Sequence, residues 1–140
     1  FSFDALSAPS LNDMQECQAV LDFVAGKTSD MTSVYPEQDL QAVREGLVVY
    51  NDFIQQDIMT PGLLAYSNND AEKAATLQQQ IDAYKTSVTA RLSTRYSQDT
   101  LVTDYAVVIN ECAKKALPPS SSDVALLKRS LETIIQLAQQ

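Results

Sequence analysis

The sequence predicts an all-α protein: a single-domain, antiparallel bundle of four or five helices that takes in residues 1–140. Apolar residues recur every three or four positions along almost the entire chain, and this is the period of an amphipathic helix. Three glycines in 140 residues are few, and the many Ala, Leu and Gln residues favour helix over strand. The links between successive apolar stripes are short, which indicates that neighbouring helices run antiparallel.

The first two predicted helices follow an irregular lead-in over residues 1–9. Ser10 is expected to cap the first helix, and Gly26 to end it. Pro36 suits the first position of a second helix. The Thr-Pro-Gly triplet at residues 60–62 is expected to stop that helix, because the residue before a proline avoids the α conformation. A link then runs to residue 69. The two apolar stripes consist of Met14, Cys17, Leu21 and Val24, and of Leu40, Val43, Leu47, Tyr50, Ile54 and Ile58.

The remaining helices are predicted from similar signals. Asn69, with an acidic residue three positions on, resembles a capping box for a third helix that runs to about Tyr96. Ser97 is expected to cap a fourth helix, which the two prolines at residues 118–119 break. Ser120 and the polar residues after it begin a fifth. The apolar positions are Ala74, Leu77, Ile81, Tyr84, Val88 and Leu92, then Leu101, Tyr105, Val108, Ile109 and Cys112, then Val124, Leu127, Leu131, Ile134 and Ala138.

Cys17 and Cys112 both lie on the apolar stripe of a predicted helix. A small, even number of cysteines without CxxC spacing fits an exported protein with one disulfide. We therefore predict a Cys17–Cys112 bond that joins the first helix to the fourth, in a secreted or periplasmic protein. The alternative is two buried free thiols in a cytosolic protein, since free cysteine is often buried. The first residue is Phe1 rather than methionine, which indicates processing or trimming.

Histidine is absent, and this removes most familiar catalytic arrangements. A Ser-His-Asp triad, an HExxH zinc site and a Glu-x-x-His di-iron site all need it. Gly26, Lys27 and Thr28 resemble the end of a phosphate-binding loop, but Leu21 occupies the position where that loop requires another glycine. We expect no catalytic residues, no cofactor and no metal, and therefore a protein that is not an enzyme.

The net charge of −8 lies in the first part of the chain. Residues 1–59 hold ten acidic and two basic residues, whereas residues 60–140 hold eight of each. An acidic surface argues against nucleic acid as a partner and is compatible with a basic protein partner. No apolar run approaches 18 residues, so no transmembrane segment is expected.

The first two helices carry more apolar residues than one core face needs. These residues are either buried between neighbouring helices, which is the ordinary case, or form a contact surface with an acidic rim. On the second interpretation, the protein is a non-enzymatic exported binding protein. Its predicted partner-binding residues are Glu16, Asp22, Phe23, Glu45, Val49, Asp52 and Phe53.

A second functional hypothesis is a carrier of a fatty acid or another apolar small molecule in the bundle interior. Apolar residues in the link over residues 60–69 could cover such a cleft, or could form a satellite cluster under the link. The predicted lining residues are Leu47, Tyr50, Leu63, Leu64, Tyr66, Tyr84 and Tyr105.

Overall fold

Helices make up most of the chain, and no strand occurs in residues 9–140, the part that the computed structural model describes. The predicted lead-in lies outside that part except for Pro9. The predicted all-α bundle is confirmed. Its elements are α2 (Leu11–Lys27), the 3-10 turn η1 (Thr28–Asp30), α3 (Glu37–Phe53), the π-helical segment η2 (Ile54–Met59), α4 (Thr60–Tyr66), α5 (Ala71–Arg95), α6 (Thr103–Lys115) and α7 (Ser121–Ala138).

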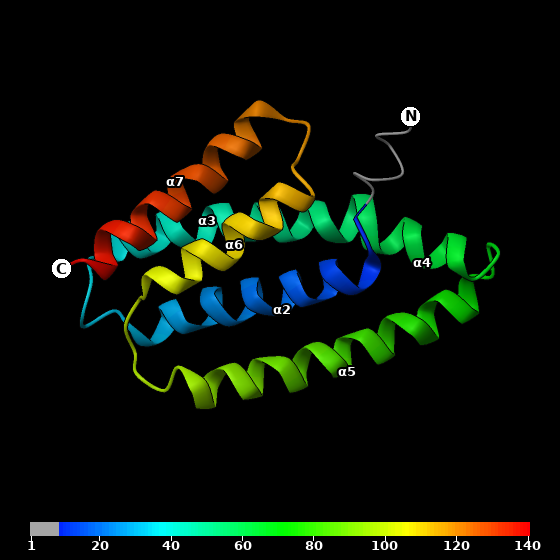
Figure 1. The fold of residues 1–140 in the computed structure, drawn as a ribbon, viewed down its shortest axis with the longest axis horizontal. Coiled ribbons are helices and arrows are strands. Elements are labelled where there is room, and N and C mark those ends of the chain that lie inside the picture. Colours follow the sequence, from blue (N-terminus) through cyan, green and yellow to red (C-terminus); the bar gives the residue numbers. More distant parts are fainter. Residues whose placement is uncertain (1–8) are drawn as a thin grey trace.

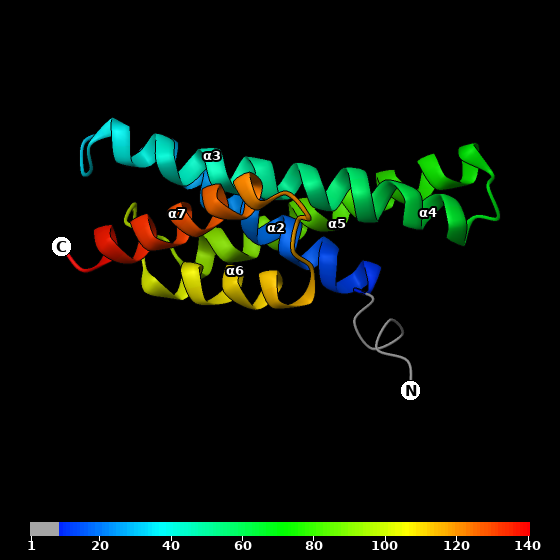
Figure 2. The same cartoon turned by 90° about the horizontal axis from the view of Figure 1, so that it is seen from above.

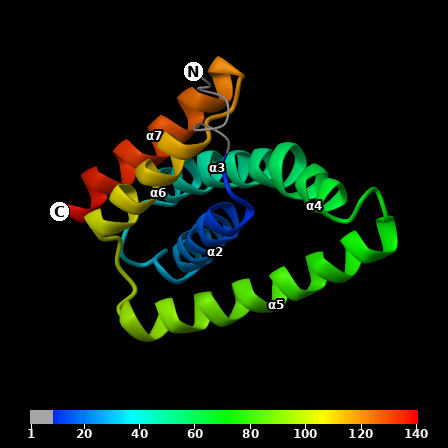
Figure 3. The ribbon, with the colours of Figure 1, turned by 45° about the vertical axis from the view of Figure 1, so that its right-hand side comes forward.

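The helix α2 lies at the centre of the bundle, where it contacts α3, α5 and α6 (Figure 1). Apart from α3 and α4, which continue each other in the same direction, consecutive helices run in opposite directions, and α2 lies between α3 and α5 (Figure 3). The last helix, α7, packs against α3 and α6. Within residues 9–140, none of the helices combines the length and the apolar character that a bilayer crossing requires.

The core explains why α2 is apolar on more than one side. Ala19 and Phe23 lie off its main stripe, yet they are 0% and 6% exposed, because α5 and α6 cover the faces that α3 does not. The ordinary alternative, burial between neighbours, therefore holds for this helix. The predicted disulfide is confirmed: Cys17 of α2 and Cys112 of α6 are bonded, with their Cα atoms 5.9 Å apart.

The predicted end of the second helix at residues 60–62 is wrong. The helix continues from α3 through η2 into α4 as one long rod (Figure 2). Inside an α-helix a proline clashes with the carbonyl four residues earlier. Here the helix widens to π geometry over Ile54–Met59, so that Pro61 falls in the first turn of α4. The missing N–H of proline is tolerated in a first helical turn.

Three predicted helix ends also differ from the structure. Gly26 lies inside the last turn of α2 with no positive φ, and the chain passes directly into η1. Asp70, not Asn69, caps α5 by accepting hydrogen bonds from two backbone N–H groups. Asn69 instead takes a left-handed conformation, with φ of 65°, which asparagine tolerates better than most residues. Ser97 does not begin α6, because residues 97–102 form a loop and Val102 precedes the first turn.

The helices α3 and α7 cross at very close range. Gly46 of α3 is buried, and a Cβ atom at this position would overlap Ser130 Oγ and the Leu126 carbonyl of α7. Ser130 Oγ donates to the carbonyl oxygens of Ala42 and Val43, at 3.0 and 2.8 Å. This contact covers the second apolar side of α3, which is why Ala42 and Gly46 are apolar although they lie off the main stripe.

Candidate functional site

Two hollows flank the central helix α2 at its opposite ends. The first lies between α4 and α5 beside the start of α2, and we call it the hairpin groove. The second lies beside the last turns of α2, where α5 ends and α6 begins, and we call it the aromatic cleft. Their volumes are about 570 and 230 Å³.

Apolar side chains from three helices line the hairpin groove. On α5, Leu77, Ile81 and Tyr84 follow one another at spacings of four and three, so they form one stripe. That stripe is only partly covered, since Val88 is the buried residue of α5. The apolar residues of the groove are Leu11, Leu63, Tyr66, Leu77, Ile81 and Tyr84.

A polar network holds α5 against α2 and η2. Gln18 of α2 is 2% exposed. Its Nε2 donates to Gln55 Oε1 at 3.1 Å, and its Oε1 accepts from Lys85 Nζ at 3.2 Å. Gln55 Nε2 in turn donates to Gln78 Oε1 of α5 at 3.0 Å. These hydrogen bonds hold α5 alongside the apolar contacts of Val88, Ile81 and Leu92 with the core, and its apolar stripe stays partly free.

The residues that line the hairpin groove are uncharged, and the charges near it come from neighbouring positions on the same segments. The lining segments 10–16, 60–66 and 70–84 contain five acidic residues and one basic residue. The Tyr84 hydroxyl donates to a Glu16 carboxylate oxygen, and this hydrogen bond raises the pKa of Tyr84 above its usual value. Two of the five acidic residues are paired with lysines outside these segments, Asp13 with Lys115 and Asp82 with Lys85. The groove therefore combines an apolar floor with a modest net negative charge nearby.

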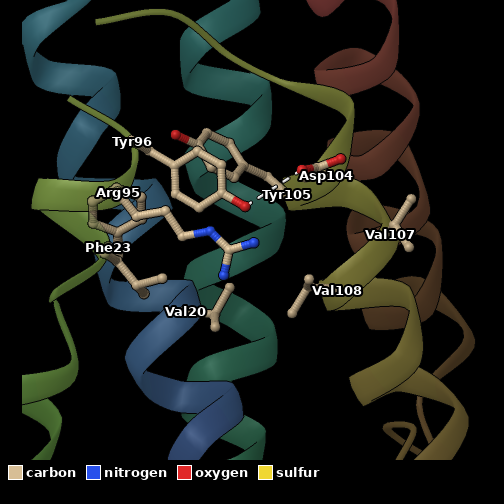
Figure 4. A pocket seen from close by; sticks show the side chains of 9 residues that line it. Val20, Phe23, Arg95, Tyr96, Asp104, Tyr105, Val107 and Val108 are labelled. Atoms are coloured by element: carbon tan, nitrogen blue, oxygen red, sulfur yellow. Dashed lines mark hydrogen bonds between the residues drawn. The ribbon is translucent and has the colours of Figure 1, made fainter. Parts of the chain in front are cut away.

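The aromatic cleft is built on three rings that contact one another. The ring of Tyr105 meets that of Phe23 edge-on at 5.8 Å and that of Tyr96 at 5.1 Å between centroids. Tilted and edge-on arrangements of this kind stabilise aromatic pairs. Figure 4 shows these rings on one side of the cleft, with Val20, Val107 and Val108 around the remaining space. The other lining residues are Leu92, Arg95 and Asp104.

Two opposite charges line the aromatic cleft without forming a salt bridge with each other. The Arg95 guanidinium lies over the Tyr96 ring, 5.4 Å from its centroid, and makes no salt bridge within residues 9–140. The Asp104 carboxylate accepts from the Tyr96 hydroxyl at 3.4 Å. Burial, followed by the nearby Tyr96 and Asp104, raises the pKa of Tyr105 to about 12, so its hydroxyl stays protonated at neutral pH.

The loop beside the cleft is fixed at two points. Lys27 Nζ donates to the Gln98 carbonyl at 2.6 Å and lies 3.4 Å from an Asp99 carboxylate oxygen. The Leu101 backbone N–H donates to the Tyr35 hydroxyl at 3.1 Å. These contacts hold Tyr96, at the start of the loop, and Tyr105, just after it, in their positions around the cleft.

The seven predicted partner-binding residues do not share one face. Phe23 is buried in the aromatic cluster. Glu16 contacts Tyr84 of α5, while Asp22 accepts from Asn51 of α3 at 2.8 Å. The remaining four lie on α3: Glu45 and Asp52 are exposed, and Val49 and Phe53 are half-buried. Their role in partner binding stays a prediction.

The predicted ligand-lining residues are divided among several places. Leu47 and Tyr50 are fully buried in the core, and the Tyr50 hydroxyl donates to the Ala116 carbonyl at 2.6 Å. Leu63, Tyr66 and Tyr84 come together in the hairpin groove. Leu64 borders a hollow on the other side of α4 and α5, and Tyr105 lines the aromatic cleft.

Sequence reasoning missed Arg95, Tyr96 and Asp104 as possible site residues. Their common signal is that they flank one loop, 97–102, between two helices. The sequence does not show that this loop folds back beside Phe23.

Among residues 9–140, no three acidic or cysteine side chains gather closely enough to hold a metal ion. No family model, curated protein or solved structure matches this chain.

Proposed function

We propose that this is a non-enzymatic binding protein whose hairpin groove takes an amphipathic, basic helix of a protein partner. The observation that carries the proposal is the incomplete covering of α5. Leu77, Ile81 and Tyr84 form a helical stripe that faces α4 and the start of α2 without being buried by them. A helix laid into the groove would cover this stripe, which is a common mode of peptide recognition.

The charge around the groove supports a basic partner. Five acidic residues and one basic residue occupy the segments that line it, and Lys85 and Lys115 pair with two of these acids, which leaves a net negative charge. Opposite charges at the rim accelerate association and select against acidic partners, while the apolar floor supplies most of the affinity. The exposed ring of Tyr66, 75% accessible, is the type of side chain that dominates binding energy at interfaces.

The proposal places this binding protein in a secreted or periplasmic setting. The disulfide between Cys17 and Cys112 supports that setting, because such bonds persist in oxidising compartments and are rare in the cytosol. The absence of histidine from the sequence supports a function without catalysis. The carrier hypothesis has less support, because Leu47 and Tyr50 fill the interior that the ligand would occupy.

The test uses a fluorescein-labelled synthetic helix of about 18 residues, five turns, with leucines on one face and lysines on the other. Fluorescence polarisation would measure its affinity for the intact, oxidised protein. We expect saturable binding that weakens as salt rises. A Glu-for-Lys version of the same peptide should bind at least about tenfold more weakly.

Matched variants locate the binding surface. Tyr66→Asp and Leu77→Asp place a charge in the groove and should each lower the affinity about tenfold or more. Val48→Asp is the control, because Val48 is an exposed apolar residue on α3 outside the groove. Equal losses in all three variants would contradict the proposal. Loss of binding on charge reversal of Glu45 and Asp52, with Tyr66→Asp silent, would instead place the surface on the outer face of α3.

A further inference from the structure

The aromatic cleft has the features of a small-molecule site that is separate from the hairpin groove. Its apolar wall exists before any ligand binds, because the rings of Phe23, Tyr96 and Tyr105 contact one another at 5.1–6.3 Å between centroids. Val107 and Val108, 55% and 42% exposed, extend this wall toward solvent. A cleft of about 230 Å³ is smaller than pockets for drug-sized ligands, so its occupant must be small.

The charges at the cleft define the polar part of that occupant. Arg95 and Asp104 line the same space from α5 and α6, and their charged groups lie farther apart than a salt bridge allows. Figure 4 shows the guanidinium of Arg95 over the open part of the cleft, with the Asp104 carboxylate on the α6 side. A ligand that carries an ammonium group and a carboxylate on the same carbon atom would pair with each of them at once.

The Arg95 guanidinium is oriented so that it can bind a carboxylate. Its position over the Tyr96 ring, at 5.4 Å, is a cation–π contact that orients the group. Its planar N–H donors match a carboxylate in a two-point contact. The Asp104 carboxylate accepts one hydrogen bond, from the Tyr96 hydroxyl at 3.4 Å, and keeps further lone pairs for an ammonium group.

We propose that the aromatic cleft binds a free α-amino acid with an apolar side chain. The ligand carboxylate contacts Arg95, its ammonium group contacts Asp104, and its side chain packs against Phe23 and Val108. Arg95 and Asp104 are both exposed, so an uncharged apolar molecule would gain no contact with either charge. A monocarboxylate would satisfy Arg95 but would lie close to the negative charge of Asp104.

The experiment compares four probes on the oxidised, isotope-labelled protein by NMR titration. They are L-leucine, D-leucine, isovalerate, which lacks the ammonium group, and isopentylamine, which lacks the carboxylate. We expect L-leucine to shift the methyl signals of Val107 and Val108 and to bind at least about tenfold more tightly than isovalerate or isopentylamine. Equal affinity of isovalerate and L-leucine would overturn the zwitterion assignment.

Variants assign the two charges. Arg95→Gln and Asp104→Asn should each weaken L-leucine binding about tenfold, because each removes one charged hydrogen-bond partner. Arg91→Gln on α5 and Glu111→Gln on α6 are matched controls, since neither residue lines the cleft; both should bind as the native protein does. Melting curves establish that each variant is folded. Unchanged affinity in Arg95→Gln, or absence of shifts with all four probes, would refute the site.

Discussion

At the scale of single residues, Asp22 of α2 is an accessible carboxylate that its neighbours partly desolvate. It faces α3 and α5 and accepts a hydrogen bond from Asn51 Nδ2 at 2.8 Å. Burial raises the pKa of Asp22 above its ordinary value of 3.8, and the nearby charge of Asp82 adds a little. The charge of Lys85 and the hydrogen bond from Asn51 act in the opposite direction but are smaller. Folding therefore disfavours the charged form of this residue.

This shift predicts a pH-dependent effect of Asp22→Asn. Between pH 3.8 and the raised pKa, the folded state binds more protons at this position than the unfolded state. The contribution of Asp22 to stability therefore falls as pH rises through that window. An asparagine can still accept from Asn51 and carries no charge to desolvate. We expect Asp22→Asn to melt above the native protein at pH 7 and to melt with it below pH 3.8.

Thermal unfolding followed by circular dichroism at both pH values provides the measurement. Asp52→Asn is the control for the loss of one acidic charge, since Asp52 is exposed on the outer side of α3. A stability gain of equal size at low and neutral pH would contradict the assigned cause.

Only some residues of the hairpin groove and the aromatic cleft could be predicted from the sequence. Tyr84 and Tyr105 were identified from their helical spacing, because such positions face other helices. For Phe23, which lies off the main stripe of its helix, the sequence left open burial between neighbouring helices and a place on a partner-binding surface. Its burial depends on α5 and α6 covering α2 from two sides, and periodicity within one helix does not contain that information. Arg95 and Asp104 meet at the cleft only through the tertiary fold.

At the scale of helices, the close crossing of α3 and α7 depends on the absence of a side chain at Gly46. An added Cβ at Gly46 would overlap a backbone carbonyl of α7, which cannot rotate away. Overpacking of a tight contact typically costs about 1–3 kcal/mol, so Gly46→Ala should lower the melting temperature. Gly26→Ala is the matched control, because a Cβ at Gly26 would meet no atom within 4 Å. It should be neutral or stabilise by about 0.5–1 kcal/mol, since alanine favours helix.

Equal effects of the two substitutions in denaturant unfolding would show that helix propensity, not the crossing, dominates at Gly46. When Gly46→Ala is combined with Ser130→Ala, we expect only a small recovery of the lost stability, because the Leu126 carbonyl remains in place.

The helix boundaries show which helix ends local sequence signals predict and which they do not. The caps at Ser10 and Ser120 were predicted correctly, because each accepts a hydrogen bond from a backbone N–H three residues on. The stop at residues 60–62 was wrong because the π-helical segment η2 places Pro61 in the first turn of α4. Gln55 of η2 is hydrogen-bonded to Gln18 and Gln78 on two other helices. These hydrogen bonds come from residues that are distant in the sequence, so the residues around position 61 do not reveal them.

At the scale of the whole molecule, the disulfide closes most of the chain into one loop. Cys17 and Cys112 are separated by 95 residues, and chain-entropy arguments give about 4–5 kcal/mol for a loop of that size. We expect Cys17→Ser combined with Cys112→Ser to lower the free energy of unfolding by up to that amount. Chemical denaturation of the double variant and of the reduced native protein should give similar midpoints. An unchanged midpoint would show that the bundle does not depend on the bond.

The same bond also determines what happens when a protease cuts the chain. The segments α3, η2, α4 and α5 all lie between Cys17 and Cys112. The turn at Asn68 and Asn69 is exposed, and exposed turns with small or polar residues are preferred cleavage sites. A single cut there leaves two fragments joined through sulfur, with the core residues of both still packed together. The protein can therefore lose the continuity of its backbone at the tip of the α4–α5 hairpin and remain one molecule in an oxidising medium.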